Sequence, residues 1–359
     1  MKNIILSLLV FLFWLESSNA QEARPTNIIM MIGDGMGIAH VTAGRTKKGR
    51  LELDQFRHLG LLLTHAYGRD YITDSAAAAT ALSTGVATKN GMIGLGPDSL
   101  KRETVLERAQ KRGKKTGIVT SCSITHATPA SYVTHVVSRN MHLEIAAQIA
   151  EATADLYLGS GWGWFLQKGA GGRRTDGKDL LAEMRLKGFT VVLSDSAFRI
   201  HQHSNNSKFI GLFAEDHVGK AQARTPRLAE LTAHALNSLS GKEGFFLLVE
   251  GSQIDWASHD NQSDQVVAEM TDFDDAIGEV VRYAKRNPGT LIIVTADHET
   301  GGYAIIGGSV NDRMVSGGFV TDDHTGAMVP LFAMGPGAEK FTGIRPNTDV
   351  GKILLEMLE

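Results

Sequence analysis

The sequence predicts an α/β fold, namely a doubly wound, mostly parallel central sheet flanked by helices. The run Phe245–Val249 is apolar without interruption. Such a run indicates a strand that is buried on both faces, as in a parallel sheet. The segment Asp264–Arg286 carries apolar residues at helical spacing. Short β-branched runs alternate with amphipathic segments along the chain, and this alternation favours parallel strands joined by helices.

The individual elements follow from local patterns. Apolar and β-branched runs predict strands at Asn27–Ile32, Gly60–His65, Thr116–Ser121, Asp155–Leu158, Thr190–Leu193, Phe209–Phe213, Phe245–Glu250, Leu291–Thr295, Tyr303–Ile306 and Val329–Ala333. Amphipathic or alanine-rich runs predict helices at Ala76–Leu82, Leu100–Lys111, His142–Ala152, Lys178–Leu186, Arg227–Leu239, Asp264–Arg286 and Asp349–Leu358. The glycine-rich polar stretch Gly159–Gly177 predicts a surface excursion and not a domain boundary. We therefore expect one catalytic domain over residues 21–359.

The composition is that of an ordinary globular protein. Of 359 residues, 43% are hydrophobic and 21% are charged. These values exclude a disordered or fibrous chain. The formal net charge of −3 argues against a wide basic surface for nucleic acid.

The N-terminus predicts export. Lys2 precedes the apolar run Ile4–Leu15, and Ser18–Ala20 forms a small-residue cleavage site, so residues 1–20 have the pattern of a signal peptide. A transmembrane anchor is the alternative, but the run is short for a membrane span and Glu16 interrupts it. We expect a periplasmic or secreted protein without a membrane anchor after signal removal.

Cys122 is the single cysteine of the sequence. The count excludes an intramolecular disulfide and a cysteine-rich metal site. Because Cys122 lies in an apolar strand-like run, we expect a small buried side chain there.

Several predicted strands are followed by residues that bind metals. Asp34 stands between glycines after the first strand, Glu250 ends the strand at residues 245–250, and Asp297 with His298 follows the strand at residues 291–295. In open α/β sheets, ligands gather at the carboxyl ends of the strands, so these side chains are expected in one crevice. On a helix, Asp255 and His259 would share one face. Histidine and carboxylate ligands suit Zn²⁺, and an oxygen-rich position suits Mg²⁺.

Ser75 and Arg139 each allow two interpretations. Ser75 opens an alanine-rich run, so it is either a helix N-cap or a nucleophile at the positive end of a helix. Arg139 begins a predicted helix, and it is either a surface side chain or a bidentate partner for phosphate oxygens.

Together these motifs resemble the alkaline phosphatase family. The resemblance runs in order from about residue 27 to the C-terminus. It is carried by Ile32–Gly37, Thr73–Ala81, His126–Ala130, Ser138–Arg139, Glu250–Asp255, Thr295–His298 and His324–Gly326.

The resemblance implies two zinc ions, a third magnesium-type ion and, usually, a homodimer. The implied ligands of the first zinc are Asp255, His259 and His324. Those of the second zinc are Asp34, Asp297 and His298, with Ser75 as the nucleophile. The third ion would be held by Asp34, Thr128 and Glu250. Arg139 would bind the phosphate. The implied reaction is hydrolysis of small phosphate monoesters to inorganic phosphate through a phosphoserine at Ser75.

Two positions depart from the best-known bacterial pattern. His126 stands where that pattern has an aspartate, so it would ligate the third ion, orient a metal-bound water there, or favour Zn²⁺ over Mg²⁺. Trp256 replaces a lysine, and it would contact the apolar part of the leaving group or serve packing.

Two alternatives remain open at this point. A phosphodiesterase or phosphonate hydrolase of the same superfamily would share the metal ligands, but those enzymes more often use threonine as the nucleophile. A non-catalytic exported binder of zinc or phosphate would not need a nucleophile at a helix start.

Overall fold

A computed structural model describes residues 24–152, 154–201 and 208–359, so the predicted signal peptide at residues 1–20 lies outside the described residues. The centre of the fold is a 10-stranded sheet. Its strands stand in the order β14 (Gly343–Pro346), β2 (His58–Leu63), β13 (Val329–Met334), β8 (Thr290–Thr295), β1 (Asn27–Gly33), β7 (Phe245–Gly251), β3 (Lys115–Ser123), β4 (Leu156–Ser160), β6 (Phe209–Leu212) and β5 (Thr190–Val192). Only β13 pairs antiparallel to its neighbours within this sheet, which confirms the predicted fold class.

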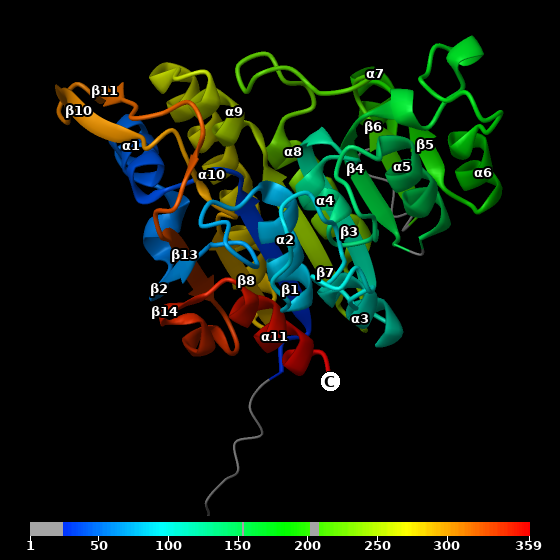
Figure 1. Cartoon of the computed structure of the whole chain (residues 1–359), viewed down its shortest axis with the longest axis horizontal. Coiled ribbons are helices and arrows are strands. Elements are labelled where there is room, and N and C mark those ends of the chain that lie inside the picture. The colour runs from blue at the N-terminus through cyan, green and yellow to red at the C-terminus, as the bar shows by residue number, and fades with distance from the viewer. Residues whose placement is uncertain (1–23, 153, 202–207) are drawn as a thin grey trace, which may run out of the picture.

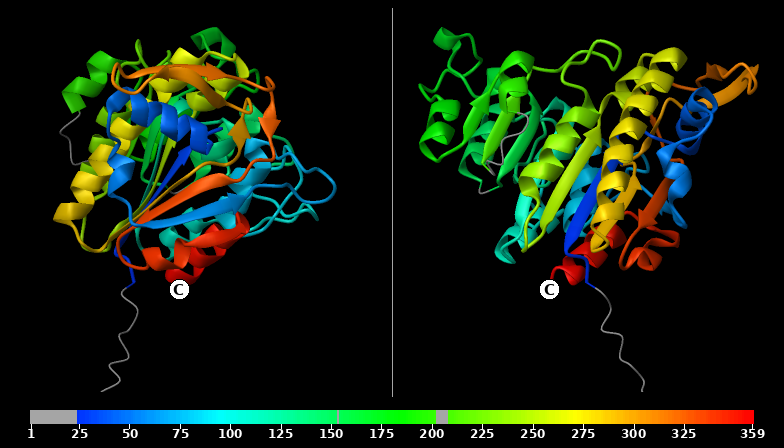
Figure 2. Two further views of the ribbon diagram at one scale, coloured as in Figure 1. Left: turned by 90° about the vertical axis from the view of Figure 1, so that its left-hand side faces the viewer. Right: turned by 180° about the vertical axis from the view of Figure 1, so that it is seen from behind.

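Helices cover both faces of the sheet, as the front and rear views show (Figures 1 and 2). In front lie α2 (Ser75–Thr84), α3 (Val105–Lys111), α4 (Ala127–Ala130) and α11 (Thr348–Met357). Behind lie α1 (Ile38–Lys48), α8 (Leu228–Leu239) and α10 (Ser263–Arg286). The remaining helices are α5 (His142–Glu151), α6 (Leu180–Leu186), α7 (Asp195–His201) and α9 (Gln253–His259). A hairpin of β10 (Ala304–Ser309) and β11 (Met314–Gly318) projects from one end, and β9 (Glu299–Thr300) pairs with β12 (His324–Thr325).

The centre of the sheet is fully buried. Every residue of β1, β7 and β8 is buried, as the uninterrupted apolar runs predict. The long helix α10 packs an apolar stripe behind these strands, including Met270, Phe273 and Ile277. Burial of apolar area is the main driving force for this arrangement, and it holds the carboxyl ends of the central strands in fixed positions.

Three predictions about local structure were wrong. The helix predicted from Leu100 begins at Val105, because Thr104 forms a capping box with Glu107 (2.9 and 3.1 Å). Arg139 does not begin a helix: its backbone N–H donates to the carbonyl of Gly91 at 2.7 Å, and α5 starts only at His142. The excursion after β4 contains short 3₁₀ turns and begins later than Gly159, which is still in the strand.

Helix α1 and several short strands were missed. Helix α1 lacks a clear apolar stripe and contains Gly44, where a Cβ would lie 2.6 Å from Met270 Cγ. Glycine thus allows α1 to approach α10 closely. The missed strands β9, β11, β12 and β14 have two to five residues, too few for a periodic pattern.

Within the described ranges, each helix is too short or too polar to cross a lipid bilayer.

Candidate metal centre

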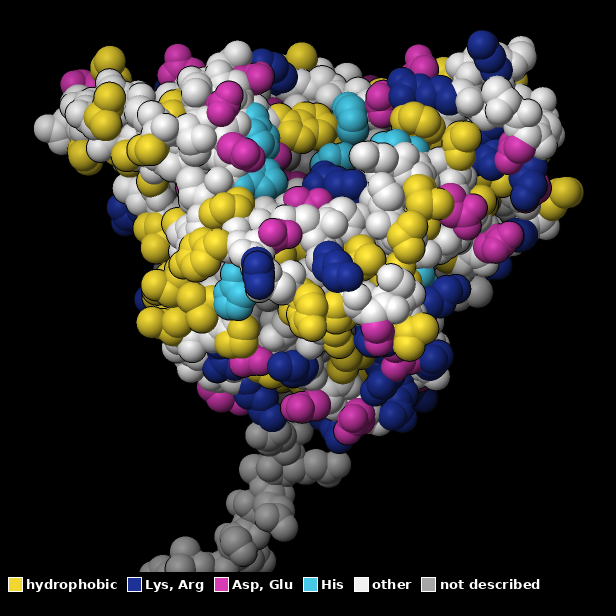
Figure 3. Space-filling view, viewed as in Figure 1, with side chains coloured by type: hydrophobic (Ala, Val, Ile, Leu, Met, Phe, Trp, Pro, Cys, Tyr) yellow, Lys and Arg dark blue, Asp and Glu magenta, His cyan; other side chains and the backbone are white. Residues whose placement is uncertain are grey.

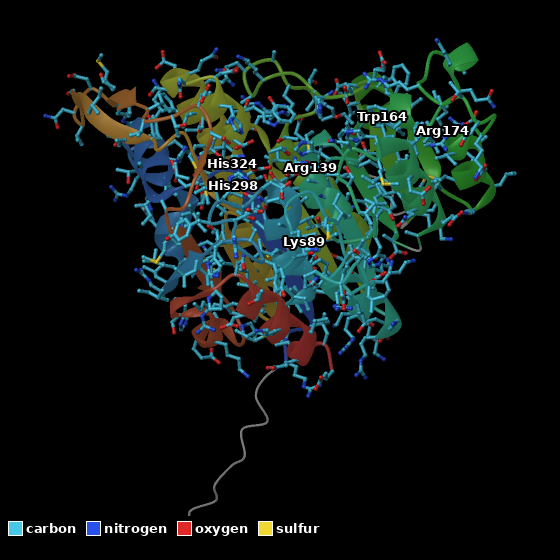
Figure 4. The ribbon with its side chains drawn as sticks, in the orientation of Figure 1. Lys89, Arg139, Trp164, Arg174, His298 and His324 are labelled. Atoms are coloured by element: carbon cyan, nitrogen blue, oxygen red, sulfur yellow. The ribbon has the colours of Figure 1, made fainter. Side chains whose placement is uncertain are left out.

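The predicted ligands meet at the carboxyl ends of four neighbouring strands, β8, β1, β7 and β3. In β1, Ile32 pairs with Glu250 of β7 on one side and with Thr295 of β8 on the other. This register places Asp34, Glu250 and Asp297 around one point. Histidine and charged side chains gather there, in the upper middle of the face in Figure 3, and Figure 4 shows His298, His324 and Arg139 close together. The expected crevice is therefore present in the fold.

Asp255, His259 and His324 form the first group, with potential ligand atoms within 4.8 Å of one another. Helix α9 supplies Asp255 and His259, which share one face as the four-residue spacing predicts. Asp255 Oδ1 lies 3.3 Å from His259 Nε2 and 3.6 Å from His324 Nε2.

The two histidines of this group are oriented by backbone carbonyls. His259 Nδ1 donates to Asp322 O at 2.6 Å, and His324 Nδ1 donates to Thr73 O at 2.9 Å. A carbonyl only accepts, so each neutral ring keeps the lone pair on Nε2. The two Nε2 atoms lie 3.1 Å apart. Two lone pairs this close, beside a carboxylate, need either a proton or a metal cation between them, and a Zn²⁺ ion fits this donor set.

Asp34, Asp297 and His298 form the second group, also within 4.8 Å of one another. All three are fully buried. His298 Nε2 lies 3.4 Å from Asp34 Oδ1 and 3.3 Å from Asp297 Oδ2. The His298 ring stacks on the His324 ring with centroids 3.6 Å apart, so the two groups are adjacent.

Thr300, which sequence reasoning missed, connects the two groups. Its hydroxyl donates to Asp255 Oδ1 at 2.5 Å and contacts His298 Nδ1 at 3.2 Å. Because its single hydrogen points to Asp255, the hydroxyl must accept from His298 Nδ1–H. The lone pair of His298 is then on Nε2, facing the carboxylates. Such outer partners fix the tautomer of a ligating histidine.

Glycine at position 35 permits this close assembly. Gly35 has a φ of +73°, and a Cβ there would lie 2.8 Å from both Asp255 Cα and Thr300 Oγ1. Any side chain would push β1 away from α9.

Asp34, Asp297 and Glu250 each have at least one buried oxygen without a hydrogen-bond partner. Burial, together with the charges of Asp297, Asp255 and Glu250, raises the pKa of Asp34 well above its usual range. Burial raises the pKa of Glu250 to about 7. Among the described residues, the centre contributes these buried atoms without a hydrogen-bond partner: Asp34 Oδ1 and Oδ2, Asp297 Oδ2, Glu250 Oε1, Thr128 Oγ1 and His126 Nδ1. Native proteins rarely leave such atoms unsatisfied, and bound cations would satisfy them.

Ser75 lies beside the second group. It is the first residue of α2 and is 2% exposed. Asp74 is the N-cap, accepting from Ala77 N at 2.9 Å, so the N-cap interpretation of Ser75 was wrong. The Ser75 hydroxyl is instead 3.2 Å from His298 Nε2, at the positive end of the helix.

Arg139 binds Asp74, the N-cap residue of α2 that directly precedes Ser75. Its Nη1 donates to Asp74 Oδ2 at 3.0 Å and its Nη2 lies 3.3 Å from His126 Nε2. Asp74 thus makes two contacts that its sequence position did not reveal: it caps α2 and binds the Arg139 guanidinium at the start of that helix. An N-cap carboxylate directly before Ser75 is the signal that could have indicated this.

The remaining predicted residues surround Glu250. Thr128 is fully buried in α4, two residues after His126, the N-cap residue of that helix. Burial and the neighbouring Arg139 lower the pKa of His126 to about 3, so its ring is neutral and can act as a ligand. Cys122 is buried as expected, but it lies next to Glu250, with Sγ 3.5 Å from Oε2.

Trp256 lies at the rim. Its ring centroid is 5.8 Å from that of His126 and 4.6 Å from that of His217, a rim residue that sequence reasoning missed. Edge-to-face contacts hold the Trp256 ring beside the centre.

Comparison with known proteins agrees with this geometry. Residues 25–315 match the family described as alkaline phosphatase. The chain is 33% identical to alkaline phosphatase 4 of Bacillus subtilis (strain 168), covering 94% of this chain and 90% of that protein. It superposes on the alkaline phosphatase of the Antarctic bacterium TAB5 with a TM-score of 0.84 at 35% identity, covering 93% of this chain and 98% of that chain.

A variant of the TAB5 enzyme in which a histidine is replaced by glutamate, with Mg bound in its M3 site, gives a TM-score of 0.85 at 35% identity and the same coverage. The family match, the coverage of these relatives and the shared fold lead to one conclusion. The chain belongs to the alkaline phosphatase family and is a metal-dependent phosphoric monoester hydrolase.

Proposed function

We propose that the chain hydrolyses small phosphate monoesters through a phosphoserine formed at Ser75. The observation that carries this proposal is the Ser75 hydroxyl, 3.2 Å from His298 Nε2 at the start of α2, directly after the N-cap residue Asp74 that binds Arg139. A buried hydroxyl that is not used for capping, beside a metal ligand, is suited to nucleophilic attack.

The ligand sets support two zinc ions, one in each His–carboxylate group, and a third ion at Asp34, Thr128 and Glu250. Bound zinc would lower the pKa of a coordinated hydroxyl and neutralise charge on the attacking and leaving oxygens. Magnesium in the M3 site of the TAB5 variant supports a third ion in this chain.

The residues of this chain then perform the reaction. Ser75 Oγ attacks phosphorus, the bond to the leaving oxygen breaks, and the leaving alcohol departs. Arg139 contacts the non-bridging phosphate oxygens through its planar fork, which Asp74 holds at 3.0 Å. Thr300 keeps the His298 lone pair directed at the centre. Water then cleaves the phosphoserine, which regenerates Ser75 and releases inorganic phosphate. At the rim, Trp256 would contact the apolar part of the leaving group.

Rates on two matched substrates test the proposed function. We expect turnover of an aryl phosphate to exceed that of the bis-aryl diester by at least about a thousandfold, because a diester lacks one of the charged oxygens that Arg139 and the metals neutralise. Steady-state kcat/KM for both esters is the measurement. Equal rates, or a preference for the diester, would favour the phosphodiesterase alternative.

We also propose export and a homodimer. The proposal of export rests on the sequence of residues 1–20.

The proposal of a dimer rests on the family resemblance and on an apolar groove of about 420 Å³ between α1 and strands β2, β13 and β14. Ile38, Leu59 and Ile344 in this groove are 55%, 55% and 65% exposed. The left panel of Figure 2 faces this edge of the molecule. Exposed apolar patches of this kind mark association surfaces.

Sedimentation velocity tests the dimer. The wild type should sediment as a dimer, and Leu59→Glu should shift it to the monomer, because two carboxylates would be buried in the symmetric contact. Leu186→Glu is the matched control, since Leu186 is 91% exposed on α6 at the other end of the sheet. A wild type that sediments as a monomer at micromolar concentration would contradict the proposal.

A further inference from the structure

The ring of His217 lies at the rim of the centre, beside Trp256. The two ring centroids are 4.6 Å apart, and the ring planes meet at 74°. On its other contact, Trp256 meets the ring of His126 at 84°, with centroids 5.8 Å apart. Trp256 is half-buried, and 34% of the His217 side chain is exposed. Trp256 and His217 therefore form a corner of two nearly perpendicular rings that is partly open to solvent.

The nitrogens of His217 are turned toward the protein. Nδ1 accepts from the backbone N–H of Ser123 at 3.2 Å. A ring nitrogen that accepts carries no proton, so the ring is neutral and its hydrogen is on Nε2. Nε2 faces Asp216 Oδ1 at 3.5 Å. A molecule in the corner would therefore meet mainly ring carbons, and it would not meet a charged imidazolium.

The acidic residues that precede His217 are paired with other side chains. Arg173 lies 3.1 Å from Glu215 Oε1 and 3.0 Å from Asp216 Oδ2. Asp216 Oδ1 also accepts from the indole N–H of Trp164 at 3.3 Å. These pairs neutralise the carboxylates of the loop, so the corner is apolar and close to uncharged.

Two anchors hold the loop that carries His217. Gln253, at the start of α9, donates through Nε2 to Ser121 O at 2.9 Å and to Val218 O at 3.0 Å, which ties the loop to strand β3. Further along the loop, Arg224 is buried and forms ion pairs with two carboxylates of α10 at 2.7 and 2.5 Å. Because the loop is already fixed, little ordering is needed when a ligand enters the corner.

The corner lies where the leaving group would depart. Displacement at phosphorus is roughly in line, so the leaving oxygen is opposite the attacking Ser75 hydroxyl. Ser75 lies beside the second group, and the leaving oxygen therefore faces the first group. Trp256 directly follows Asp255, a member of that first group, on helix α9. Figure 3 shows an apolar side chain between histidines in the upper middle of this face.

We propose that Trp256 and His217 form a subsite that favours phosphate monoesters with an uncharged aromatic leaving group. An aromatic ring that stacks on one wall of the corner presents its edge to the other wall, and aromatic pairs prefer both arrangements. A charged leaving group would lose water there without gaining a partner. His217 is thus a specificity-determining residue. This inference rests on the hydrolysis proposed above.

Rates on two esters test the subsite. Phenyl phosphate carries an aromatic leaving group, whereas the leaving group of methyl phosphate has only one carbon. His217→Asn removes the ring, but its Oδ1 can still accept from Ser123 N, so the loop should stay anchored. We expect kcat/KM on phenyl phosphate to fall about fivefold, mainly through KM, and kcat/KM on methyl phosphate to change less than about twofold.

Trp256→Leu should show the same pattern with a larger loss on phenyl phosphate, about tenfold, because it removes the larger ring. Each variant is compared with the wild type on the same ester. The different acidities of phenol and methanol therefore cancel in the comparison.

Calorimetric titration of the zinc-loaded protein gives a readout without turnover. Benzylphosphonate has the shape of phenyl phosphate, with a CH₂ group in place of the bridging oxygen, and it cannot be hydrolysed at that bond. We expect the wild type to bind benzylphosphonate about fivefold more tightly than methylphosphonate. His217→Asn should remove this preference and leave the affinity for methylphosphonate unchanged.

His142→Asn is the matched control. His142 also packs its ring on a tryptophan, Trp164, with centroids 4.5 Å apart. Figure 4 shows Trp164 well away from His298 and His324. The same substitution in this second pair should leave the rates on both esters unchanged.

Two results would overturn the inference. One is a wild type that binds benzylphosphonate no more tightly than methylphosphonate, a result that needs no variant. The other is a His217→Asn enzyme with equal losses on phenyl and methyl phosphate, or with no loss on either. Hydrolysis of methyl phosphate by the wild type measures the proposed function separately, so a failed subsite is distinct from a failed hydrolase.

Discussion

Replacing Ser75 with alanine should lower kcat for an aryl phosphate by at least about a thousandfold, or about 4 kcal/mol of transition-state stabilisation. The substitution removes the only atom that would form the phosphoserine and leaves the metal ligands in place. Ala is a good helix former, and Asp74 still caps α2 through Ala77 N, so the fold should not change. Zinc content should match that of the wild type.

Ser83→Ala is the matched control for this variant. Ser83 lies on the same helix and is buried, but its hydroxyl donates to Ser131 O at 2.7 Å, away from the metal ligands. It should lower stability by about 1 kcal/mol and leave kcat unchanged. Acid quenching during turnover should yield a phosphorylated Ser75 peptide from the wild type. A Ser75→Ala enzyme that keeps more than about a tenth of the wild-type rate would contradict the nucleophile assignment.

The sequence predicted the architecture well wherever the pattern was long. Runs such as Phe245–Val249 can be satisfied only by burial on both faces, so the central strands were located to within a residue or two. The same burial fixed the site: once the central strands are parallel neighbours, Asp34, Glu250 and Asp297 must meet at their carboxyl ends.

The sequence could not predict contacts that depend on how side chains are oriented in the fold. Thr300 follows Asp297 and His298, but nothing in its residue type shows that its hydroxyl bridges to Asp255, 45 positions away. Cys122 in an apolar run has the pattern of a buried filler, and its contact with Glu250 arises only from the pairing of β3 with β7. Helix α1 was missed because Gly44, needed for close packing on α10, weakens any periodic signal.

Chelation of zinc should abolish turnover, with a loss of at least about a thousandfold, and Zn²⁺ should restore it while Mg²⁺ alone should not. Both His–carboxylate groups present imidazole nitrogens that Mg²⁺ binds poorly. The Nε2 atoms of His259 and His324 face each other at 3.1 Å. Without a metal ion between them, this group has nothing that can hold a substrate oxygen. The measurement is the rate on an aryl phosphate after dialysis against a chelator and re-addition of each metal.

The affinity for zinc should also depend on pH in a defined direction. In the metal-free chain, Asp255 raises the pKa of His259 to about 9. Below that pH the histidine carries a proton that zinc must displace. The apparent affinity of the first group should therefore rise about tenfold per pH unit toward pH 9 and then level off. Competition with a chromophoric chelator between pH 6 and pH 8 measures this slope.

Two histidine substitutions distinguish the protonation of His259 from general effects of pH on zinc affinity. His259→Gln removes the titrating ligand, so it should weaken binding and reduce the slope by one proton. His135→Gln is the matched control, because His135 also faces a carboxylate, Glu107, at 2.9 Å, and its pKa is also raised, but the pair lies away from the metal ligands. It should leave both affinity and slope unchanged. If the wild-type affinity were independent of pH in this range, Asp255 and His259 would not be joint ligands of a zinc ion.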